Sequence, residues 1–346
     1  MSSLSARAEI LLKTLVNRYV SDGQPVGSGV LARQSGLEVS PATVRNVMAD
    51  LEQLGLVVSP HTSAGRIPTQ KGYRVFVDSL LKIQPLSSET VNALRGEIGH
   101  CSDAQRMLST ATDMLSQLSS MASLVTLPRN PDRHGFKQIE FVGLSGTRVL
   151  VILVSQSGAV QNRVIHTDRG YSPSELVEAA NYFNETYAGQ TLEQVKQALA
   201  AEMKLDSETM AQAMRRAVTM AQQVFADADD AENLVVRGES NLMEFPDLGD
   251  MRQMRHLFNA FNTKRDLLHL LDRSDRETGV KIFIGNESGY QPLEQCSVVT
   301  SPYKVGNEIV GMLAVVGPTR MAYEKVIPLV DITARLLGTA LSADND

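Results

Sequence analysis

Residues 28–73 read SGVLARQSGLEVSPATVRNVMADLEQLGLVVSPHTSAGRIPTQKGY, and the pattern of this stretch is the most informative in the N-terminal part of the chain. Its pattern predicts a short helix, a tight turn, a second helix, and then a two-stranded ribbon with a basic tip. Gly36 suits the turn because glycine adopts positive φ without steric cost. This order of elements is typical of a winged helix-turn-helix, which places one helix in the major groove of DNA.

The second helix of the stretch begins at Ser40-Pro41. Serine can cap the free N–H groups of a helix, and proline suits the first helical position. A first helix is expected at about residues 4–20, ended by Ser21-Asp22-Gly23. The apolar residues of the second helix form one stripe, which consists of Val44, Val47, Met48, Leu51 and Leu54.

The opposite side of the second helix has the residue types that read bases. Arg45 and Asn46 offer a guanidinium and an amide, which can bind guanine and adenine edges respectively. Ala42 and Ala49 are small enough to permit close approach, and Thr43 lies on the flank. The same face could also be a merely solvated helix surface, and its residues alone leave the two interpretations open.

The segment that follows favours the DNA-binding interpretation, because residues 56–58 can pair with residues 65–67 as a wing hairpin. The tip of such a wing contacts phosphate or the minor groove. A third helix is expected from Thr69 to Leu81, with basic side chains available to the DNA backbone. The predicted DNA-binding residues are Ser40, Thr43, Arg45, Asn46, His61, Thr62, Ser63, Arg66, Lys71 and Arg74.

Charge is distributed unevenly along the 346 residues, although the net charge of −6 is acidic. Residues 1–82 hold nine Lys or Arg and six Asp or Glu, which gives +3, and the remainder therefore carries −9. A positively charged head on a negatively charged body is the charge distribution expected for a DNA-binding protein. Apolar runs such as 149–154 and 309–316 are too short to span a bilayer, and no secretion signal precedes the head, so a cytoplasmic protein is expected.

In the body, from residue 83 onward, the spacing of apolar residues changes several times between helical and strand periods. Residues 87–125 predict a long helical region, broken near Gly99, whose apolar positions suit either packing within the subunit or an intersubunit seam. Strands are expected at 138–144, 148–155, 160–166, 280–284 and 309–316. Helices are expected at 174–225, 251–271 and 323–341. Strands on both sides of a helical block indicate an α/β domain that carries an insertion.

The head closely resembles the family of the heat-inducible transcription repressor HrcA. The resemblance is carried by PATVRN at 41–46 and by HTSAGRIPT at 61–69, and it continues in GESNL at 238–242 and GMLAVVGPTRMAY at 311–323. It implies an α+β, multidomain chain: a winged helix-turn-helix at 1–82, a helical linker at 83–130, a GAF-like α/β domain at 131–190 and 255–346, and a helical inserted dimerising domain at 191–254.

The resemblance also implies a function. Members of this family are dimeric repressors that bind an inverted-repeat operator, the CIRCE element, upstream of chaperone operons in the heat-shock response. The GroE chaperonin keeps the repressor active, and heat stress releases the genes. The expected partners are therefore double-stranded DNA, a second copy of the chain and the chaperonin, with no membrane.

Patterns for catalysis, metal binding or a cofactor were not found. Gly143–Gly146 lacks the lysine of a phosphate-binding loop, and Cys101 and Cys296 match no metal or redox spacing. The six histidines are scattered without ligand spacing. An enzyme, a metal site and a cofactor are therefore not expected. The alternative function is a metabolite-responsive regulator with a small effector in the GAF-like domain, which fold alone does not exclude.

Overall fold

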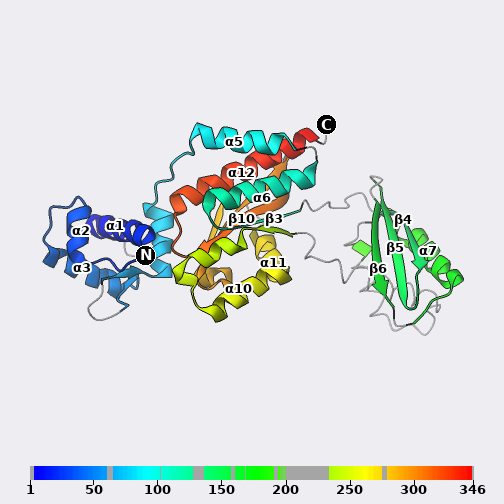
Figure 1. Ribbon diagram of the computed structural model, residues 1–346, viewed down its shortest axis with the longest axis horizontal. Helices are drawn as coiled ribbons and strands as arrows, with labels where there is room; N and C mark the ends of the chain where they lie inside the picture. Colours follow the sequence, from blue (N-terminus) through cyan, green and yellow to red (C-terminus); the bar gives the residue numbers. More distant parts are fainter. Residues whose placement is uncertain are drawn as a thin grey trace. The chain divides into compact units, whose positions relative to one another are not determined.

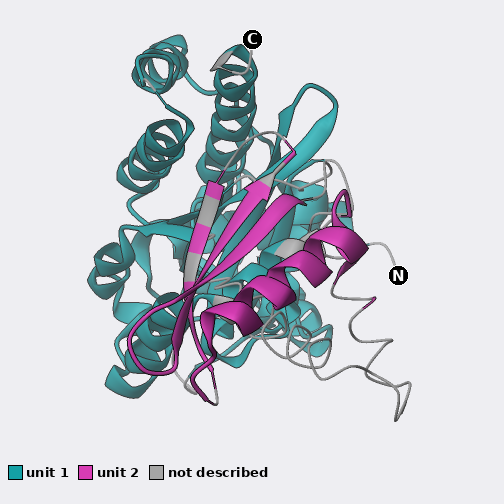
Figure 2. Cartoon of the chain, turned by 90° about the vertical axis from the view of Figure 1, so that its right-hand side faces the viewer, with its two compact units in different colours: residues 1–128, 231–346 teal, residues 129–230 magenta. Residues whose placement is uncertain are grey.

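The computed structural model describes residues 4–60, 65–101, 103–127, 136–156, 160–167, 169–190, 194, 195, 198, 234–274 and 279–344. The chain divides into two compact units (Figure 2). Unit 1 contains Met1–Pro128 and Ala231–Asp346, and unit 2 is Arg129–Asp230. The inserted unit thus begins and ends earlier than the expected 191–254, because the strands at 136–166 form a sheet of their own.

The N-terminal head has the predicted order of elements (Figure 1). Its helices are α1 (Ala6–Asp22), α2 (Ser28–Gln34) and α3 (Pro41–Gln53), followed by the wing strands β1 (Val57–Val58) and β2 (Ile67–Pro68). The expected third helix is present as α4 (Gln70–Val75), continued by a π-helical turn, η1 (Phe76–Leu80). Phe76 in that turn is fully buried and closes the head's core over α1.

Two glycines allow the head to pack tightly. A Cβ on Gly65 would lie 2.4 Å from the main-chain carbon of Val26, whose N–H and C=O bond Arg66 at 2.9 Å each. A Cβ on Gly72 would lie 2.0 Å from the main-chain oxygen of Leu56. Because backbone cannot give way as a flexible side chain can, both positions require glycine. The wing is thereby held against the segment between α1 and α2 and against α4.

The helical region after the head consists of α5 (Ser88–Gly99) and α6 (Ala104–Ser119), with the expected break near Gly99. Residues 122–125, expected to be helical, instead belong to strand β3 (Ala122–Thr126). Ser120 ends α6 in the left-handed conformation, with φ of 55°. Both helices bury their apolar side within the subunit, against α12 (Tyr323–Asp344), so the intrasubunit interpretation of the stripe is confirmed.

The C-terminal domain is a three-layer structure around a five-stranded antiparallel sheet. The strand order is β7-β3-β10-β9-β8, with β7 (Leu234–Arg237), β8 (Lys281–Ile284), β9 (Cys296–Val305) and β10 (Glu308–Pro318). Helices α6 and α12 cover one face, with α5 packed against both of them, and α10 (Met251–Thr263) and α11 (Arg265–Ser274) cover the other face (Figure 1). Short helical turns η3 (Glu239–Glu244), η4 (Pro246–Leu248), η5 (Gly285–Ser288) and η6 (Gln291–Leu293) join these elements.

Alternation along β10 explains why the sheet is buried on both faces. Leu313 and Val315 pack toward α12, and Met312, Ala314 and Val316 pack toward α10 and α11. Helix α12 is long and apolar enough to cross a membrane, but just over half of that stretch is buried inside the protein. Such a helix is weak support for a membrane span, since the core helix of a globular protein satisfies the same criteria.

The GESNL segment at 238–242 lies in the C-terminal domain and not in the insertion. Gly238 has a φ of 70°, and Asn241 donates to Ser116 Oγ at 3.1 Å and to the main-chain oxygen of Met121 at 3.3 Å. These bonds fasten the chain, just after the inserted unit, to the end of α6 and the start of β3.

Unit 2 contains a three-stranded antiparallel meander and a helix. The strands β4 (Phe136–Gly143), β5 (Arg148–Ser155) and β6 (Val160–His166) match the three expected strands. Helix α7 (Pro173–Tyr187) covers one face of this sheet, with Phe183 fully buried among the inward residues. Beyond Tyr187, most of the expected helix to residue 225 lies outside the described residues.

Candidate DNA-binding surface

Helix α3 is fixed at its N-terminus by the predicted cap. Ser40 Oγ accepts from the Thr43 main-chain N–H at 3.2 Å and lies 3.0 Å from Thr43 Oγ1. Both hydroxyls are therefore engaged with each other at the start of the helix. Val44, Met48 and Leu51 are buried and anchor α3 against the rest of the head.

The exposed face of α3 presents the two side chains that were predicted to read bases. Arg45 and Asn46 are both exposed, and among the residues that the structure describes neither has a hydrogen-bond or ion-pair partner. Asp50 is also exposed, one turn farther along the helix. A free guanidinium next to a free amide can form bidentate bonds with base edges in a major groove, and the carboxylate would disfavour phosphate nearby.

Arg66 lies at the base of the wing, where Glu52 of α3 holds its guanidinium. Glu52 Oε2 accepts from Nε at 3.0 Å and from Nη2 at 2.9 Å, with both side chains about one-third exposed. This ion pair couples the wing to the recognition helix, and a phosphate contact by Arg66 would require it to open. The wing-tip residues His61, Thr62 and Ser63 lie outside the described part of the chain.

Lys71, which was predicted to contact the DNA backbone, forms a hydrogen bond within the head. Its Nζ donates at 2.8 Å to the main-chain oxygen of Leu54, at the C-terminus of α3. A cation there complements the partial negative charge at the end of the helix. Thr69 adds a second tie, since its hydroxyl donates to the Gly55 oxygen at 2.6 Å and caps α4 through Gly72 N–H. In this conformation Lys71 is a helix cap.

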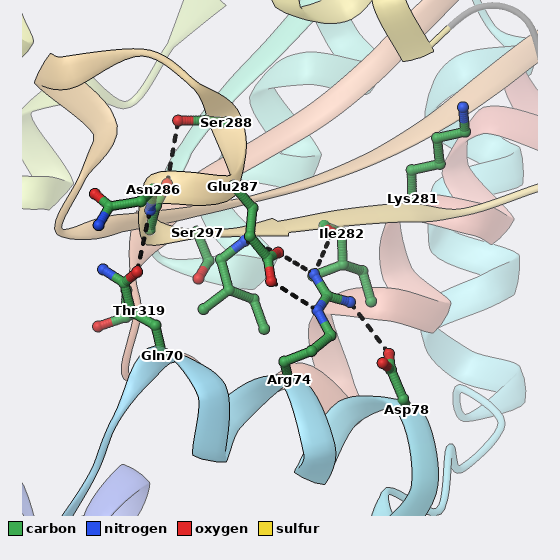
Figure 3. A network of polar contacts seen from close by, with 12 residues as sticks. Gln70, Arg74, Asp78, Lys281, Ile282, Asn286, Glu287, Ser288, Ser297 and Thr319 are labelled. Atoms are coloured by element: carbon green, nitrogen blue, oxygen red, sulfur yellow. Dashed lines mark hydrogen bonds and ion pairs between the residues drawn. The ribbon is translucent and has the colours of Figure 1, made fainter. Parts of the chain in front are cut away.

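Arg74 contacts the C-terminal domain, contrary to the expectation that it contacts the DNA backbone (Figure 3). Its Nε donates to Glu287 Oε1 at 3.0 Å, and its Nη2 donates to Glu287 Oε2 and to the Ile282 oxygen, the latter at 2.6 Å. Asp78, one turn along the same helix, accepts from Nη1 at 3.1 Å. Hydrogen bonding to Glu287 is the main cause of the raised pKa of Arg74. A contact between Arg74 and the DNA backbone would therefore require these bonds to open.

Gln70 adds two further bonds to the same contact. Its Nε2 donates to the Glu294 oxygen at 3.0 Å. Its Oε1 accepts from the Asn286 main-chain N–H at 3.2 Å (Figure 3). Gly285, with a φ of 57°, leaves room for the side chain of Gln70, because a Cβ at Gly285 would lie 2.1 Å from Gln70 Nε2. No local sequence signal marks these contacts, because the partners are more than 200 residues apart.

A second contact joins the head to the C-terminal domain at the end of α1. Arg320, paired with Asp247, donates to the Val20 oxygen at 3.2 Å. Its guanidinium also lies close to Gly23, where a Cβ would meet it at 3.1 Å. Helix α1 has no basic residue in its last turn, and Arg320 supplies that charge from outside the head.

The C-terminal domain contains a cavity of about 150 Å³ between α10, η6 and the start of β9. Leu248, Leu257 and Cys296 form its buried floor, and exposed polar side chains such as Gln253 and His256 lie at its rim. In the described ranges, no group of three or more His, Cys, Asp or Glu could hold a metal ion.

Comparisons with known proteins agree with this architecture. Residues 3–81 match the family model described as "Winged helix-turn-helix transcription repressor, HrcA DNA-binding", and residues 105–327 match "HrcA protein C terminal domain". The "Heat-inducible transcription repressor HrcA" of Methylobacillus flagellatus is 48% identical over 98% of this chain and 99% of its own length. A solved structure described as a hypothetical protein at 2.2 Å resolution is similar in fold, with a TM-score of 0.62 and 21% identity over 99% of this chain and all of that one.

Proposed function

The chain belongs to the HrcA family of heat-inducible transcription repressors, and we propose that it binds a CIRCE-type inverted repeat as a dimer and represses class I chaperone operons. The observation that carries this proposal is the exposed face of α3, where Arg45 and Asn46 have no partner among the described residues. Both can therefore bond base edges without breaking an existing contact. A repressor of this kind acts in the cytoplasm, where the chromosome lies.

Recognition proceeds from the helix, and the wing adds backbone contacts. Arg45 reads guanine and Asn46 reads adenine in the major groove, and the wing tip at 61–63 contacts the adjacent backbone. Ser40 and Thr43 hold the first turn of α3, whose N–H groups lie closest to the phosphates. Two-fold symmetry of the dimer matches the two-fold symmetry of the operator, with half-sites about one helical turn apart or a multiple of it.

The dimer forms through the open face of the sheet in unit 2. Among the described residues of that unit, α7 covers one face, and no helix covers the other. Val142, Leu150 and Val164 are cross-strand neighbours on that open face, and Val142 and Val164 are 42% and 46% exposed. A contiguous apolar row across three strands indicates a protein–protein interface, and a second copy would cover it symmetrically.

An ultracentrifugation experiment tests the dimer. Val164→Asp places a charge in the middle of the row and is expected to give a monomer. Val177→Asp is the matched control, since Val177 is 58% exposed on α7 and lies outside the row. A Val164→Asp chain that remains dimeric, with the wild-type dissociation constant, would refute this interface.

Heat control follows from competition for the GroE chaperonin. The chaperonin binds exposed apolar chain and returns the repressor to its native, DNA-binding state. Heat supplies unfolded proteins that occupy the chaperonin, so the active fraction of repressor falls and the genes are released. Mass action on a marginally stable protein is sufficient for this response.

A gel-shift experiment tests the function as a whole. The probe is an inverted-repeat operator, with and without chaperonin, before and after mild heating. We expect binding that heating abolishes and chaperonin restores. A chain that binds the operator no better than random DNA, or that chaperonin does not restore, would refute the corresponding part of the proposal.

In the alternative function, a metabolite-responsive regulator, the small effector would bind in the cavity beside α10. A thermal-shift screen with small metabolites separates the two functions. Stabilisation by a metabolite that also releases the operator, with no response to chaperonin, would favour the alternative.

A further inference from the structure

Helix α4 connects the head to the C-terminal domain through two side chains. Arg74 binds Glu287 and the Ile282 oxygen, and Gln70 binds the Glu294 oxygen and the Asn286 N–H. The carboxylate of Glu287 is itself held by the Ile284 N–H at 2.8 Å. We refer to these bonds as the α4 clamp (Figure 3).

Apolar packing continues from the head across the clamp. A single hydrophobic cluster contains Leu15 and Phe76 of the head together with Val330 of α12. The same cluster contains the rings of Tyr73 from the head and Tyr323 from the C-terminal domain, whose centroids lie 6.1 Å apart. The head therefore contacts the C-terminal domain through a packed core with polar bonds at its edge.

The covalent connection between head and body would not by itself hold the head in place. Residues 81–87 form neither helix nor strand and are mostly exposed. Seven residues can extend to about 25 Å, which is comparable with the roughly 34 Å between half-sites one turn apart. A head held only by this linker would sample positions that miss the neighbouring half-site.

The docked position leaves the recognition face uncovered. The clamp uses α4, whereas Arg45 and Asn46 project from α3 and remain exposed in the docked state. Docking therefore does not block the base-reading side chains, and its effect on DNA binding is to orient them.

We propose that Arg74, Gln70 and Glu287 are positioning residues that lock the recognition helix onto the C-terminal domain, so that a dimer presents its two heads in the arrangement required by an inverted repeat. This inference rests on the proposed dimeric operator binding. Undocking reduces the fraction of heads in the binding-competent position, and the apparent dissociation constant rises by the inverse of that fraction. If nine heads in ten are undocked, affinity falls about tenfold for each head.

The test uses the full-length chain with Glu287→Gln and Gln70→Ala, singly and together. Glu294→Gln is the matched control, because Glu294 contributes to the clamp through its main-chain oxygen and not its carboxylate. Head docking is measured by the rate of tryptic cleavage after Lys82, which is exposed in the linker. DNA binding is measured on an inverted repeat and on a single half-site.

We expect the double variant to be cleaved after Lys82 at least about tenfold faster and to lose about tenfold affinity per head for the inverted repeat. Half-site affinity should stay at the wild-type value, which separates positioning from misfolding of the head. The control should match the wild type in both assays. Arg74→Met combined with Glu287→Gln should change both readouts by less than the sum of the two single changes, because the Arg74–Glu287 bonds are lost in each of them.

Two results would overturn the inference. One is faster cleavage with unchanged inverted-repeat affinity, which would make the docked position irrelevant to DNA binding. The other is increased affinity, which would make docking inhibitory. A wild-type chain that binds inverted repeat and half-site equally well would instead refute the proposed dimeric recognition, and the inference with it.

Discussion

Tyr73 is buried between the head and the C-terminal domain with an unsatisfied hydroxyl. The residue is 3% exposed, and its Oη has no hydrogen-bond partner among the described residues. Burial is the main cause of the raised pKa of this phenol. Tyr73→Phe keeps the ring and its contact with Tyr323 but removes the hydroxyl. Because an unsatisfied buried polar group costs about 1–3 kcal/mol, we expect this variant to be more stable than the wild type by about that amount.

A second buried tyrosine provides the control of opposite sign. Tyr303 is fully buried, and its hydroxyl donates to the Thr126 oxygen at 2.6 Å. Tyr303→Phe removes the same atom, but it leaves that carbonyl without this bond, so it is expected to destabilise the protein by about 1–3 kcal/mol. The two substitutions are chemically identical and differ in whether the hydroxyl is bonded.

Differential scanning calorimetry measures both variants. For a cooperative unit of 150–250 residues, 1 kcal/mol shifts Tm by about 2–4 °C. We expect Tm to rise by about 2 °C or more for Tyr73→Phe and to fall by at least as much for Tyr303→Phe. The temperature at which heating releases operator DNA should rise with Tm in Tyr73→Phe. A fall in Tm for Tyr73→Phe would contradict this expectation, because it would show that the hydroxyl makes a favourable interaction.

Three further outcomes are expected. Arg45→Ala should weaken operator binding by roughly 1–3 kcal/mol and lower sequence discrimination in fluorescence anisotropy, whereas an equal loss on random DNA would make Arg45 a phosphate contact. Burial raises the pKa of the Cys296 thiol to about 12. A disulfide reagent at pH 8 should therefore modify Cys101 alone in the native protein, and both thiols after denaturation. Rapid labelling of Cys296 in the native protein would contradict its burial. Burial raises the pKa of Glu287, but hydrogen bonds from Arg74 and the Ile284 N–H outweigh it and lower the pKa overall. The stability contributed by this carboxylate is therefore complete above about pH 4.5 and lost as pH falls through the lowered pKa. Because trypsin is inactive at acidic pH, hydrogen exchange in residues 81–87 should be used to measure the loss of this stability. Glu287→Gln should abolish its pH dependence.

Local signals predicted the head well because its elements are set by neighbours in sequence. Ser40-Pro41 marks the start of α3, and Val44, Met48 and Leu51 of the predicted stripe form its buried face. Leu54, at the C-terminal end of the stripe, is 41% exposed, contrary to the prediction. Residues 122–125 were predicted wrongly because their apolar spacing continues that of α6. Pairing with β10 (Leu124 opposite Ala314, for example) makes them a strand, and that partner lies nearly 200 residues away.

Long-range pairing also explains the other differences from the sequence-based predictions. The strands at 136–166 were predicted as strands, but local patterns do not reveal which strands share a sheet, and they were assigned to the wrong domain. Arg74 has the position and charge of a DNA contact. Glu287, which redirects it, is 213 residues away and is adjacent only in the folded chain. Contacts between domains are the part of the site that composition and spacing do not encode.

We have proposed that the exposed face of α3 reads an inverted-repeat operator. Its most direct test is an anisotropy titration of the purified full-length chain against a CIRCE-type inverted repeat and a scrambled duplex of equal length, at physiological salt. Specific DNA-binding proteins prefer their sites by about 10³-fold or more, and we expect at least that ratio, reduced in Arg45→Ala. Equal affinity for the two duplexes, or a ratio unaffected by Arg45→Ala, would contradict the claim.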